Sequence, residues 1–191
     1  MIVFFDLETG GLELTHPIIE LAMVATDMQY QTVSELHMRL KFDESKADEQ
    51  ALEINHYDKK LWDETAVSVL TAVQRIDGFL AGYRSVQMIS RRTGNPYTVA
   101  RLAAHNATFD GPRIFRIYEQ LGKFLAADRR VLDTLQMALW YCLKHKQAPE
   151  NYKLGTLCQF FGLETGESHT ALDDCKAAVR LAAHLSNGEP K

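Results

Sequence analysis

The chain opens with a strand-like run that ends in acidic residues. Residues 2–7, IVFFDL, are mostly apolar and β-favouring, which predicts a short strand buried on both faces within a sheet. Side chains alternate along a strand, so Asp6 and Glu8 share one face, where two ionised carboxylates are costly without a cationic partner. A divalent metal ion would supply that partner, because hard cations prefer carboxylate oxygen. The alternative is that the strand ends before the acids and that both are solvated.

A second polar cluster, HNATFD at 105–110, lies between a predicted strand and a predicted helix. Asp110 is placed either for a function or to favour the N-terminus of a helix that opens at Pro112. Asn106 is placed either in a site or simply in the turn. The cluster alone does not decide between the two readings.

A third cluster, HTALDD at 169–174, leads into the last predicted helix. Helical spacing puts Asp174 on the apolar stripe that faces the core, whereas Asp173 faces solvent. Thr170 and Asp173 resemble a helix-capping pair. His169 would then lie just outside the helix, either as a functional group or as a surface histidine.

The rest of the chain predicts one α/β domain, because strands come first and helices then alternate with strands. The domain is expected over residues 1–186, with a loose tail at 187–191 and a basic loop or hairpin inserted at 83–98. Residues 43–60 read as polar and irregular. Further strands are predicted at about 18–26, 32–42, 99–104 and 131–132, and helices at about 64–80, 112–121, 133–145, 153–161 and 171–185.

Composition narrows the class of protein. The chain has 191 residues, no apolar run long enough to span a bilayer, and no basic leader of a signal peptide, so no membrane contact is expected. Three scattered cysteines without CxxC spacing argue against disulfides or structural zinc, and favour the cytoplasm. The net charge of −4 is unusual for a protein that grips long duplexes, which suggests a small footprint on nucleic acid or a site made positive by metal.

Together the three clusters supply four acids and one histidine. Two divalent ions roughly 3.5–4 Å apart, held by such carboxylates, can activate a water and stabilise a leaving oxygen in phosphoryl transfer. A histidine that is neutral near pH 7 can accept the proton of the water.

The motifs D-L-E-T (6–9), H-N-A-T-F-D (105–110) and H-T-A-L-D-D (169–174) resemble, in order and separation, those of the DEDDh (DnaQ-like) 3′→5′ exonucleases. This family includes the proofreading epsilon subunit of bacterial DNA polymerase III and ribonuclease T. The resemblance spans about residues 2–185. It implies an α/β, ribonuclease H-like fold with a central mixed β-sheet flanked by α-helices. It also implies two Mg²⁺ or Mn²⁺ ions per site.

The resemblance assigns a role to each site residue. The expected metal ligands are Asp6, Glu8, Asp110 and Asp174, and the expected general base is His169. Glu20 and Asp133 are expected to support the site structurally. Five residues match positions that line the terminal nucleotide in relatives: Thr9, Leu12, His105, Asn106 and Phe109. Gly10, which follows Thr9, is a sixth expected substrate contact.

The expected function is removal of nucleotides, as nucleoside 5′-monophosphates, from the 3′ end of single-stranded nucleic acid, with DNA favoured. An exoribonuclease or oligoribonuclease of the same family, and an inactive nucleic-acid-binding relative, are the alternatives. Relatives often carry a second threonine where this chain has Gly10, which removes one hydroxyl from the expected substrate contacts. Docking to a polymerase or another replication or repair protein is a further expectation.

Overall fold

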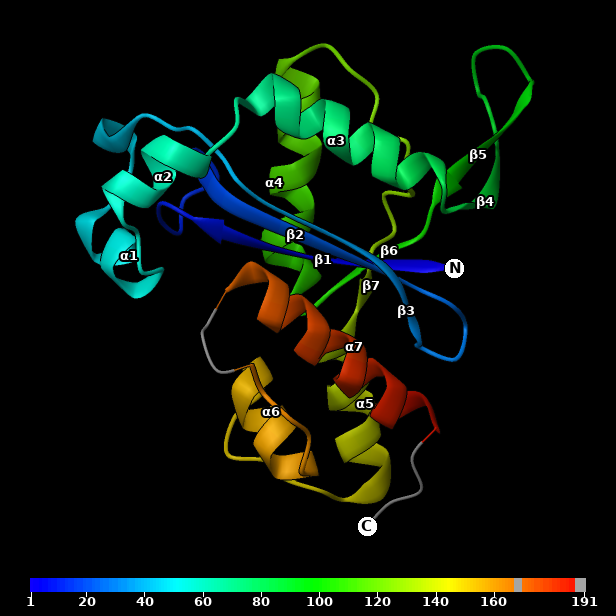
Figure 1. Ribbon diagram of the computed structural model, residues 1–191. Helices are drawn as coiled ribbons and strands as arrows, with labels where there is room; N and C mark the ends of the chain where they lie inside the picture. Colours follow the sequence, from blue (N-terminus) through cyan, green and yellow to red (C-terminus); the bar gives the residue numbers. More distant parts are fainter. Residues whose placement is uncertain (167–169, 188–191) are drawn as a thin grey trace.

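The computed structural model describes residues 1–166 and 170–187, which fold around a five-stranded sheet with helices on both faces (Figure 1). The strand order is β3-β2-β1-β6-β7, with β1 antiparallel to β2 and parallel to β6, so the predicted mixed sheet flanked by helices is confirmed. The strands of this sheet are β1 (Ile2–Thr9), β2 (Ile18–Thr26), β3 (Thr32–Arg39), β6 (Leu102–Ala104) and β7 (Leu132–Asp133).

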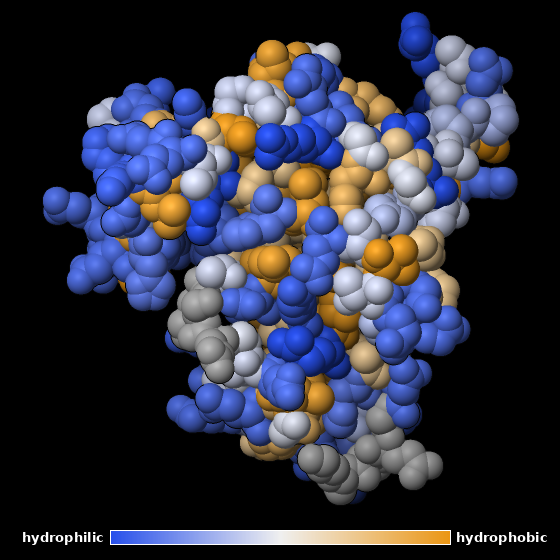
Figure 2. Space-filling model, in the orientation of Figure 1, coloured by the Kyte–Doolittle hydropathy of each residue, from blue (hydrophilic) through white to orange (hydrophobic). Residues whose placement is uncertain are grey.

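Helices cover the two faces unequally. On one face α3 and α4 pack against β1 and β2, and on the other α7 crosses the same strands with α5 and α6 packed beside it. From the α7 side, Figure 2 shows mostly hydrophilic residues with apolar residues exposed between them. The helices are α1 (Glu49–Ile54), α2 (Lys59–Thr65), α3 (Val69–Ala81), α4 (Ala107–Gln120), α5 (Thr134–His145), α6 (Leu154–Phe161) and α7 (Ala171–Asn187), with a 3₁₀ turn, η1, at Glu44–Lys46.

The alternation of β1 decides where its acids point. Phe5 packs in the core under α3 and α4, whereas Phe4 packs in the core under α7. Asp6 and Glu8 follow Phe4 at intervals of two, so they lie on the α7 face. The strand continues to Thr9 and both acids are partly buried, so the alternative that β1 ends before them is wrong.

The segment 43–60 is not irregular, contrary to the sequence prediction. It contains η1 and α1 and leads into α2, which starts at an N-cap, Asp58, whose carboxylate accepts the Leu61 N–H at 2.7 Å. These helices are short, and few apolar residues such as Leu52 and Trp62 attach them to the sheet beside Ile19. So few anchors leave no helical periodicity to read in the sequence.

The helix predicted over 64–80 corresponds to α3 but begins later, because residues 64 and 65 belong to α2. α2 ends at Thr65, and α3 begins at Val69 after Ser68, whose hydroxyl accepts the Thr71 N–H at 3.1 Å. The predicted strand 32–42 likewise ends early, at Arg39. Phe42, beyond it, packs near the small cluster around Trp62 instead.

The basic segment 83–98, predicted to be a loop or a hairpin, is a hairpin. β4 (Arg84–Ile89) pairs antiparallel with β5 (Pro96–Ala100) in a separate two-stranded sheet that projects from the body of the molecule (Figure 1). The strand predicted over 99–104 is therefore divided, its first part in the hairpin and its second in β6.

Helix α4 starts at Ala107, five residues before the predicted start at Pro112, which lies inside the helix. The start is fixed by a distant residue. The carboxylate of Asp133 accepts the N–H groups of Asn106 at 3.0 Å and Ala107 at 3.1 Å, while Asn106 adopts the left-handed conformation (φ 59°). A cap supplied from 26 residues away leaves no local pattern in the sequence.

The last three helices lie close to their predicted positions. Gly162, with φ 68°, ends α6 as expected, and α7 continues two residues beyond the predicted 185.

Cys142, Cys158 and Cys175 are free and buried. In the part of the chain that the structure describes, no helix combines the length and apolar character needed to cross a membrane. The extent of the domain, 1–186, stays a prediction.

Candidate active site

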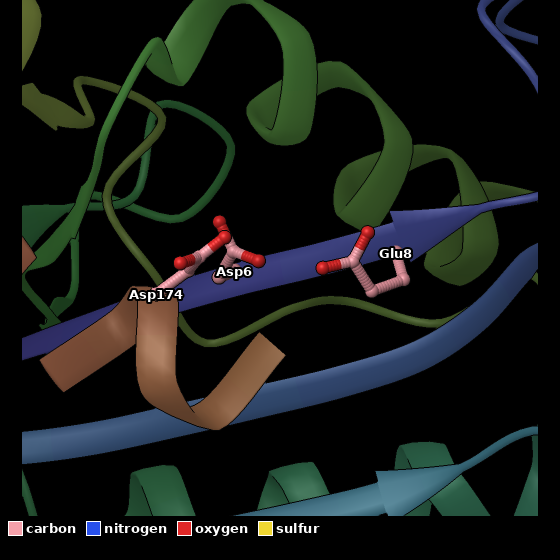
Figure 3. Close-up of side chains that lie close together, drawn as sticks. All are labelled: Asp6, Glu8 and Asp174. Carbon is pink, nitrogen blue, oxygen red and sulfur yellow. The ribbon is translucent and has the colours of Figure 1, made fainter. Parts of the chain in front are cut away.

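Three carboxylates from opposite ends of the chain meet on the α7 face of the sheet. Asp6 and Glu8 come from β1 and Asp174 from the first turn of α7, and Figure 3 shows their side chains gathered over the strand. One ligand oxygen from each lies within 4.8 Å of the others. Carboxylate oxygens at this spacing suit a hard divalent cation, so the donor set fits the magnesium or manganese expected from the motifs.

Asp110 belongs to the same site. A cleft of about 450 Å³ is lined by the three carboxylates, by Asp110 from α4 and by neighbouring residues of the second motif. Asp110 is buried, with 4% of its surface exposed. All four predicted metal ligands therefore line one cleft.

Burial and mutual repulsion raise the pKa values of three of the four carboxylates. Burial raises the pKa of Glu8 to about 7, and the nearby charges of Asp174 and Glu20 add to the effect. Burial also raises the pKa of Asp110 to about 8, although the Arg113 guanidinium opposes the shift. The pKa of Asp6 is raised well above its ordinary value by burial and then by the charge of Asp110. A bound cation would reverse these shifts.

The start of α7 orients Asp174. Thr170 donates to the Asp173 carboxylate at 3.0 Å and accepts the Asp173 N–H at 3.2 Å, so the predicted capping pair is present. Asp173 is thereby held at the helix end, while Asp174 faces β1. The expected general base, His169, lies outside the described residues, and its role stays a prediction.

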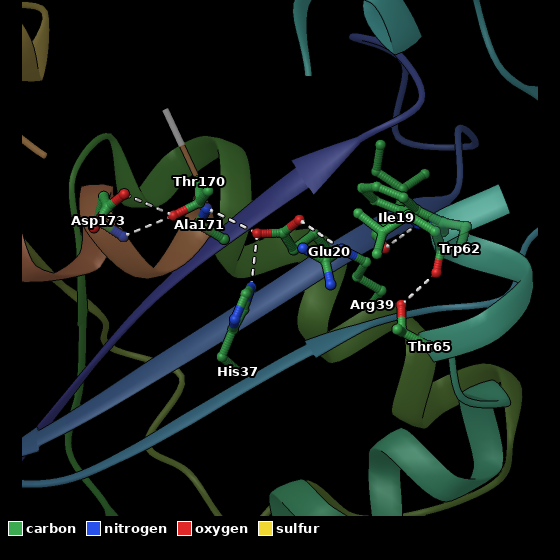
Figure 4. Close-up of polar contacts among 10 residues, drawn as sticks. Ile19, Glu20, His37, Arg39, Trp62, Thr65, Thr170, Ala171 and Asp173 are labelled. Atoms are coloured by element: carbon green, nitrogen blue, oxygen red, sulfur yellow. Dashed lines mark hydrogen bonds and ion pairs between the residues drawn. The ribbon is translucent and has the colours of Figure 1, made fainter. Parts of the chain in front are cut away.

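Glu20 supports the site from β2, directly opposite Glu8 on β1. Figure 4 shows its contacts with Ala171, His37 and Arg39. Its Oε1 accepts the backbone N–H of Ala171 at 3.2 Å and contacts His37 Nε2 at 2.8 Å, while Arg39 lies 3.9 Å from Oε2. Glu20 is buried and ties the first residue of α7 to the sheet. This agrees with its expected supporting role.

His105 of the second motif and Asp133 of β7 support the wall of the cleft. The ring of His105 contacts Thr134 Oγ1 at 2.9 Å through Nδ1 and the Tyr152 carbonyl at 3.0 Å through Nε2. Burial lowers the pKa of this histidine. Asp133, which caps α4, also accepts the Leu135 N–H at 2.9 Å. His105 lines the cleft with both ring nitrogens bonded inside the protein, and Asp133 is a structural support as expected.

The other expected substrate contacts fall into two groups. Asn106 and Phe109 line the cleft, whereas Thr9, Gly10 and Leu12 are not among its lining residues. Thr9 is buried and its hydroxyl donates to the Gly11 carbonyl at 2.8 Å. Gly10 is also buried, and Leu12 is 82% exposed. Substrate contact by all of these residues stays a prediction.

Arg113 connects these two groups and carries no pattern in the sequence that would single it out. Its guanidinium donates to the Phe109 carbonyl at 2.7 Å and to the Leu12 carbonyl, and lies 3.5 Å from the centre of the Phe109 ring. Arg113 is buried. It fixes the exposed Leu12 beside the half-buried Phe109.

Sequence reasoning also missed one wall of the cleft. Tyr152, Lys153 and Leu154, at the start of α6, line it together with Leu135 of α5. Lys153 is exposed and brings a positive charge to the acidic site. No motif marks these residues, since α6 reaches the cleft only through tertiary packing.

Comparison with known proteins points to one enzyme family. Residues 97–182 match the model of the RNase_T family, described as exonuclease, and this stretch includes the second and third motifs. Over 84 residues the chain is 39% identical to DNA polymerase III PolC-type of Caldanaerobacter subterraneus subsp. tengcongensis, covering 43% of this chain and 5% of that protein. Over 80 residues it is 34% identical to DNA polymerase III PolC-type of Bacillus subtilis, covering 42% and 5%. The chain thus spans about a twentieth of the length of these relatives.

Solved structures share the fold across nearly the whole chain. The zinc-bound complex of E. coli exonuclease I with single-stranded DNA superposes with a TM-score of 0.78 at 16% identity, covering 99% of this chain and 41% of that one. Another structure of exonuclease I gives a TM-score of 0.74 at 14% identity, covering 95% of this chain and 40% of that one. The ribonuclease H-like fold is confirmed. With the family match, the resemblance to the DnaQ-like exonucleases is confirmed too, and the exonuclease class of enzyme is supported.

Proposed function

We propose that this chain, similar to the DnaQ-like exonucleases in motifs and fold, is a divalent-metal-dependent 3′→5′ exonuclease that releases nucleoside 5′-monophosphates from single-stranded DNA. The observation that carries the proposal is the meeting of Asp6, Glu8 and Asp174 within 4.8 Å in a cleft that Asp110 also lines. Four carboxylates in one partly buried cleft repel one another and are costly to ionise. A purely structural role does not require such a cluster, whereas binding of a cation does.

The carboxylates are the proposed holders of two Mg²⁺ or Mn²⁺ ions. When bound, such ions stabilise the negative charge that develops on phosphoryl oxygens and lower the pKa of water. The pKa of Asp6 is raised first by burial and then by the nearby charges of Asp110, Glu8 and Asp174, which a bound cation would offset. Glu20 and the capped first turn of α7 keep Asp174 facing β1.

The remaining roles belong to residues around the carboxylates. His169 is the proposed general base that takes the proton of the attacking water. Phe109 and Leu12, which Arg113 links through their carbonyls, are proposed to hold the terminal base, and Asn106 is proposed to contact the sugar or phosphate. Lys153 lines the cleft at the start of α6 and is a candidate contact for the terminal phosphate.

Single-stranded DNA is the favoured substrate class. Exonuclease I is solved with single-stranded DNA, and the sequence relatives are DNA polymerases. The polymerase relatives also motivate the proposal that this chain acts beside a polymerase or another replication or repair protein. Its three buried free cysteines fit the proposed location in the cytoplasm.

The test uses 5′-labelled DNA and RNA of one sequence, incubated with Mg²⁺, Mn²⁺ or EDTA. The expected result is a ladder that shortens from the 3′ end of DNA, is absent in EDTA, and is lost in Asp174→Asn. Asp63→Asn, a loss of the same charge at an exposed position on α2, is the matched control and keeps full activity. Faster loss of RNA than DNA would establish the exoribonuclease alternative. Intact DNA and RNA under every metal condition would overturn the catalytic proposal.

A further inference from the structure

Two hollows beside α4 join into one groove outside the acidic cleft. Their volumes are about 650 Å³ and about 620 Å³. Both are lined by Phe115, Glu119, Arg129 and Arg130, so one continues into the other. We call this surface the basic groove. It follows α4 toward the β4–β5 hairpin.

The basic groove begins where the acidic cleft ends. Its first hollow is lined by Ala107 and Thr108, at the first turn of α4, whereas Asn106 and Phe109 of the same turn line the cleft. The N-terminus of α5 separates the two in the same way, with Leu135 lining the cleft and its neighbour in the chain lining the groove. The cleft and the groove are therefore adjacent across the first turn of α4.

The side chains that line the groove carry a net positive charge, although the net charge of the whole chain is negative. Five basic and three acidic side chains line its two hollows, against a net charge of −4 for the chain. Arg129 and Arg130 are paired, at 2.6 Å with Glu119 and 2.9 Å with Asp128. The other three basic side chains are Arg91, Arg116 and Lys123. None of them has a carboxylate within ion-pair distance among residues 1–166 and 170–187.

Aromatic rings stand at the far end of the groove. Tyr97 on β5 and Phe124 after α4 both line it, with their ring centres 6.1 Å apart and their planes at 71°. Phe124 is 66% exposed. Exposed aromatic rings beside basic side chains are typical of surfaces that bind single-stranded nucleic acid, because bases stack on the rings while the basic groups contact phosphates.

We propose that the basic groove binds the part of the DNA strand upstream of the terminal nucleotides, with Arg116, Arg91 and Lys123 on phosphates and Phe124 and Tyr97 under bases. The proposal rests on the exonuclease function proposed above. The 14 residues of α4 span about 20 Å, which is about six nucleotides at roughly 3.4 Å each. Substrates of four nucleotides therefore occupy the cleft without reaching the far end of the groove.

The experiment compares hydrolysis of a 4-nucleotide and a 16-nucleotide DNA by the wild type and by the double variant Arg91→Gln/Lys123→Gln. The double variant is expected to raise KM for the 16-mer about tenfold without changing kcat. Two lost phosphate contacts also reduce the slope of log affinity against log salt by about 1.4. Both kinetic constants for the 4-mer stay unchanged.

The matched control is Lys60→Gln/Arg75→Gln, which removes the same charge from exposed positions on α2 and α3, away from the groove. It is expected to behave as wild type on both lengths. An unchanged KM for the 16-mer, or an equal rise for both lengths, in the groove variant would overturn the proposal. A single Phe124→Ser variant, expected to raise the KM for the 16-mer alone, tests the stacking contact separately.

Binding measured without turnover separates the two proposals. Fluorescence anisotropy in EDTA reports the affinity of labelled 16-mer and 4-mer directly. If the wild type hydrolyses neither DNA but binds the 16-mer more tightly than the double variant does, the groove stands and the catalytic proposal fails. If it hydrolyses both and the two proteins bind the 16-mer equally, the groove proposal fails alone.

Discussion

Glu8 and Glu20 lie directly opposite each other on β1 and β2, and Glu20 forms hydrogen bonds within the protein. Glu20 holds the first N–H of α7 at 3.2 Å and contacts His37 at 2.8 Å. Among the described residues no group donates a hydrogen bond to Glu8, which instead faces Asp6 and Asp174. Glu20 therefore stabilises the structure around the site, whereas Glu8 is the one of the two proposed to bind a cation.

This difference predicts opposite effects of the same substitution. Glu8→Gln is expected to lower kcat at least a hundredfold while leaving the protein without metal as stable as the wild type or more stable, because it removes a repelled charge. Glu20→Gln is expected to lower the free energy of unfolding by about 1–3 kcal/mol, since two hydrogen bonds weaken. Urea unfolding in EDTA and rates in Mg²⁺ distinguish the two. Equal destabilisation by both would contradict the assignment.

The raised carboxyl pKa values predict how stability depends on pH. Glu8 and Asp110 shift from 4.5 and 3.8 to about 7 and about 8 on folding, so their favourable contribution is complete below about pH 4 and is lost as pH rises to 8. In EDTA the free energy of unfolding is expected to fall across this window, by at most about 1.4 kcal/mol per pH unit for each group.

Divalent metal should reverse that trend, because it binds the ionised carboxylates. At a concentration of a hundred times its dissociation constant, the metal ion adds about 2.7 kcal/mol to the free energy of unfolding. Its affinity rises toward pH 8, because the carboxylates are then ionised. Thermal unfolding between pH 4 and 8, with Mg²⁺ and with EDTA, measures both effects. Asp6→Asn is the control and should show a smaller response to metal. A stabilisation by Mg²⁺ that is the same at pH 5 and pH 8 would argue against these ligands.

Gly10 is required by close packing. A Cβ at this position would lie 2.7 Å from Ala47 Cβ and 3.1 Å from Pro17 Cγ, and the Gly10 carbonyl accepts the Asp48 N–H at 2.7 Å. Gly10→Ala is therefore expected to destabilise the protein by about 1–3 kcal/mol and to displace the segment before α1. Gly78→Ala is the control, because nothing lies within 4 Å of its added Cβ and alanine favours the helix. Chemical unfolding that ranks the two variants equally would refute the packing argument.

Arg113 is expected to act on substrate binding through Leu12 and Phe109. Arg113→Met keeps the apolar stem but removes the donors to both carbonyls, so KM for a 4-nucleotide DNA should rise several-fold more than kcat falls. Loss of charged hydrogen bonds also costs about 2 kcal/mol of stability. Arg75→Met, at an exposed position on α3 away from the cleft and the groove, is the matched control and should leave kinetics on the 4-mer unchanged. A pure loss of stability with unaltered KM would make Arg113 structural only.

Much of the site could be read from the sequence because its chemistry is local. Asp6 and Glu8 share a strand face by the period of two, and Asp174 shares a helix face with core residues by the period of 3.6. The Thr170–Asp173 cap is also a local pattern, and it is present. These expectations held because each depends on residues within one element.

Tertiary structure alone decided the rest. The start of α4 depends on Asp133, the wall formed by Tyr152 and Lys153 depends on how α6 packs, and α1 and α2 are held by a few contacts around Trp62. In each case the partners are far apart in the chain, so no periodicity or capping pattern records them. The sequence by itself therefore determined which acids form the site, whereas the fold determined what surrounds them and left one of two opposite glutamates without a hydrogen-bond donor among the described residues.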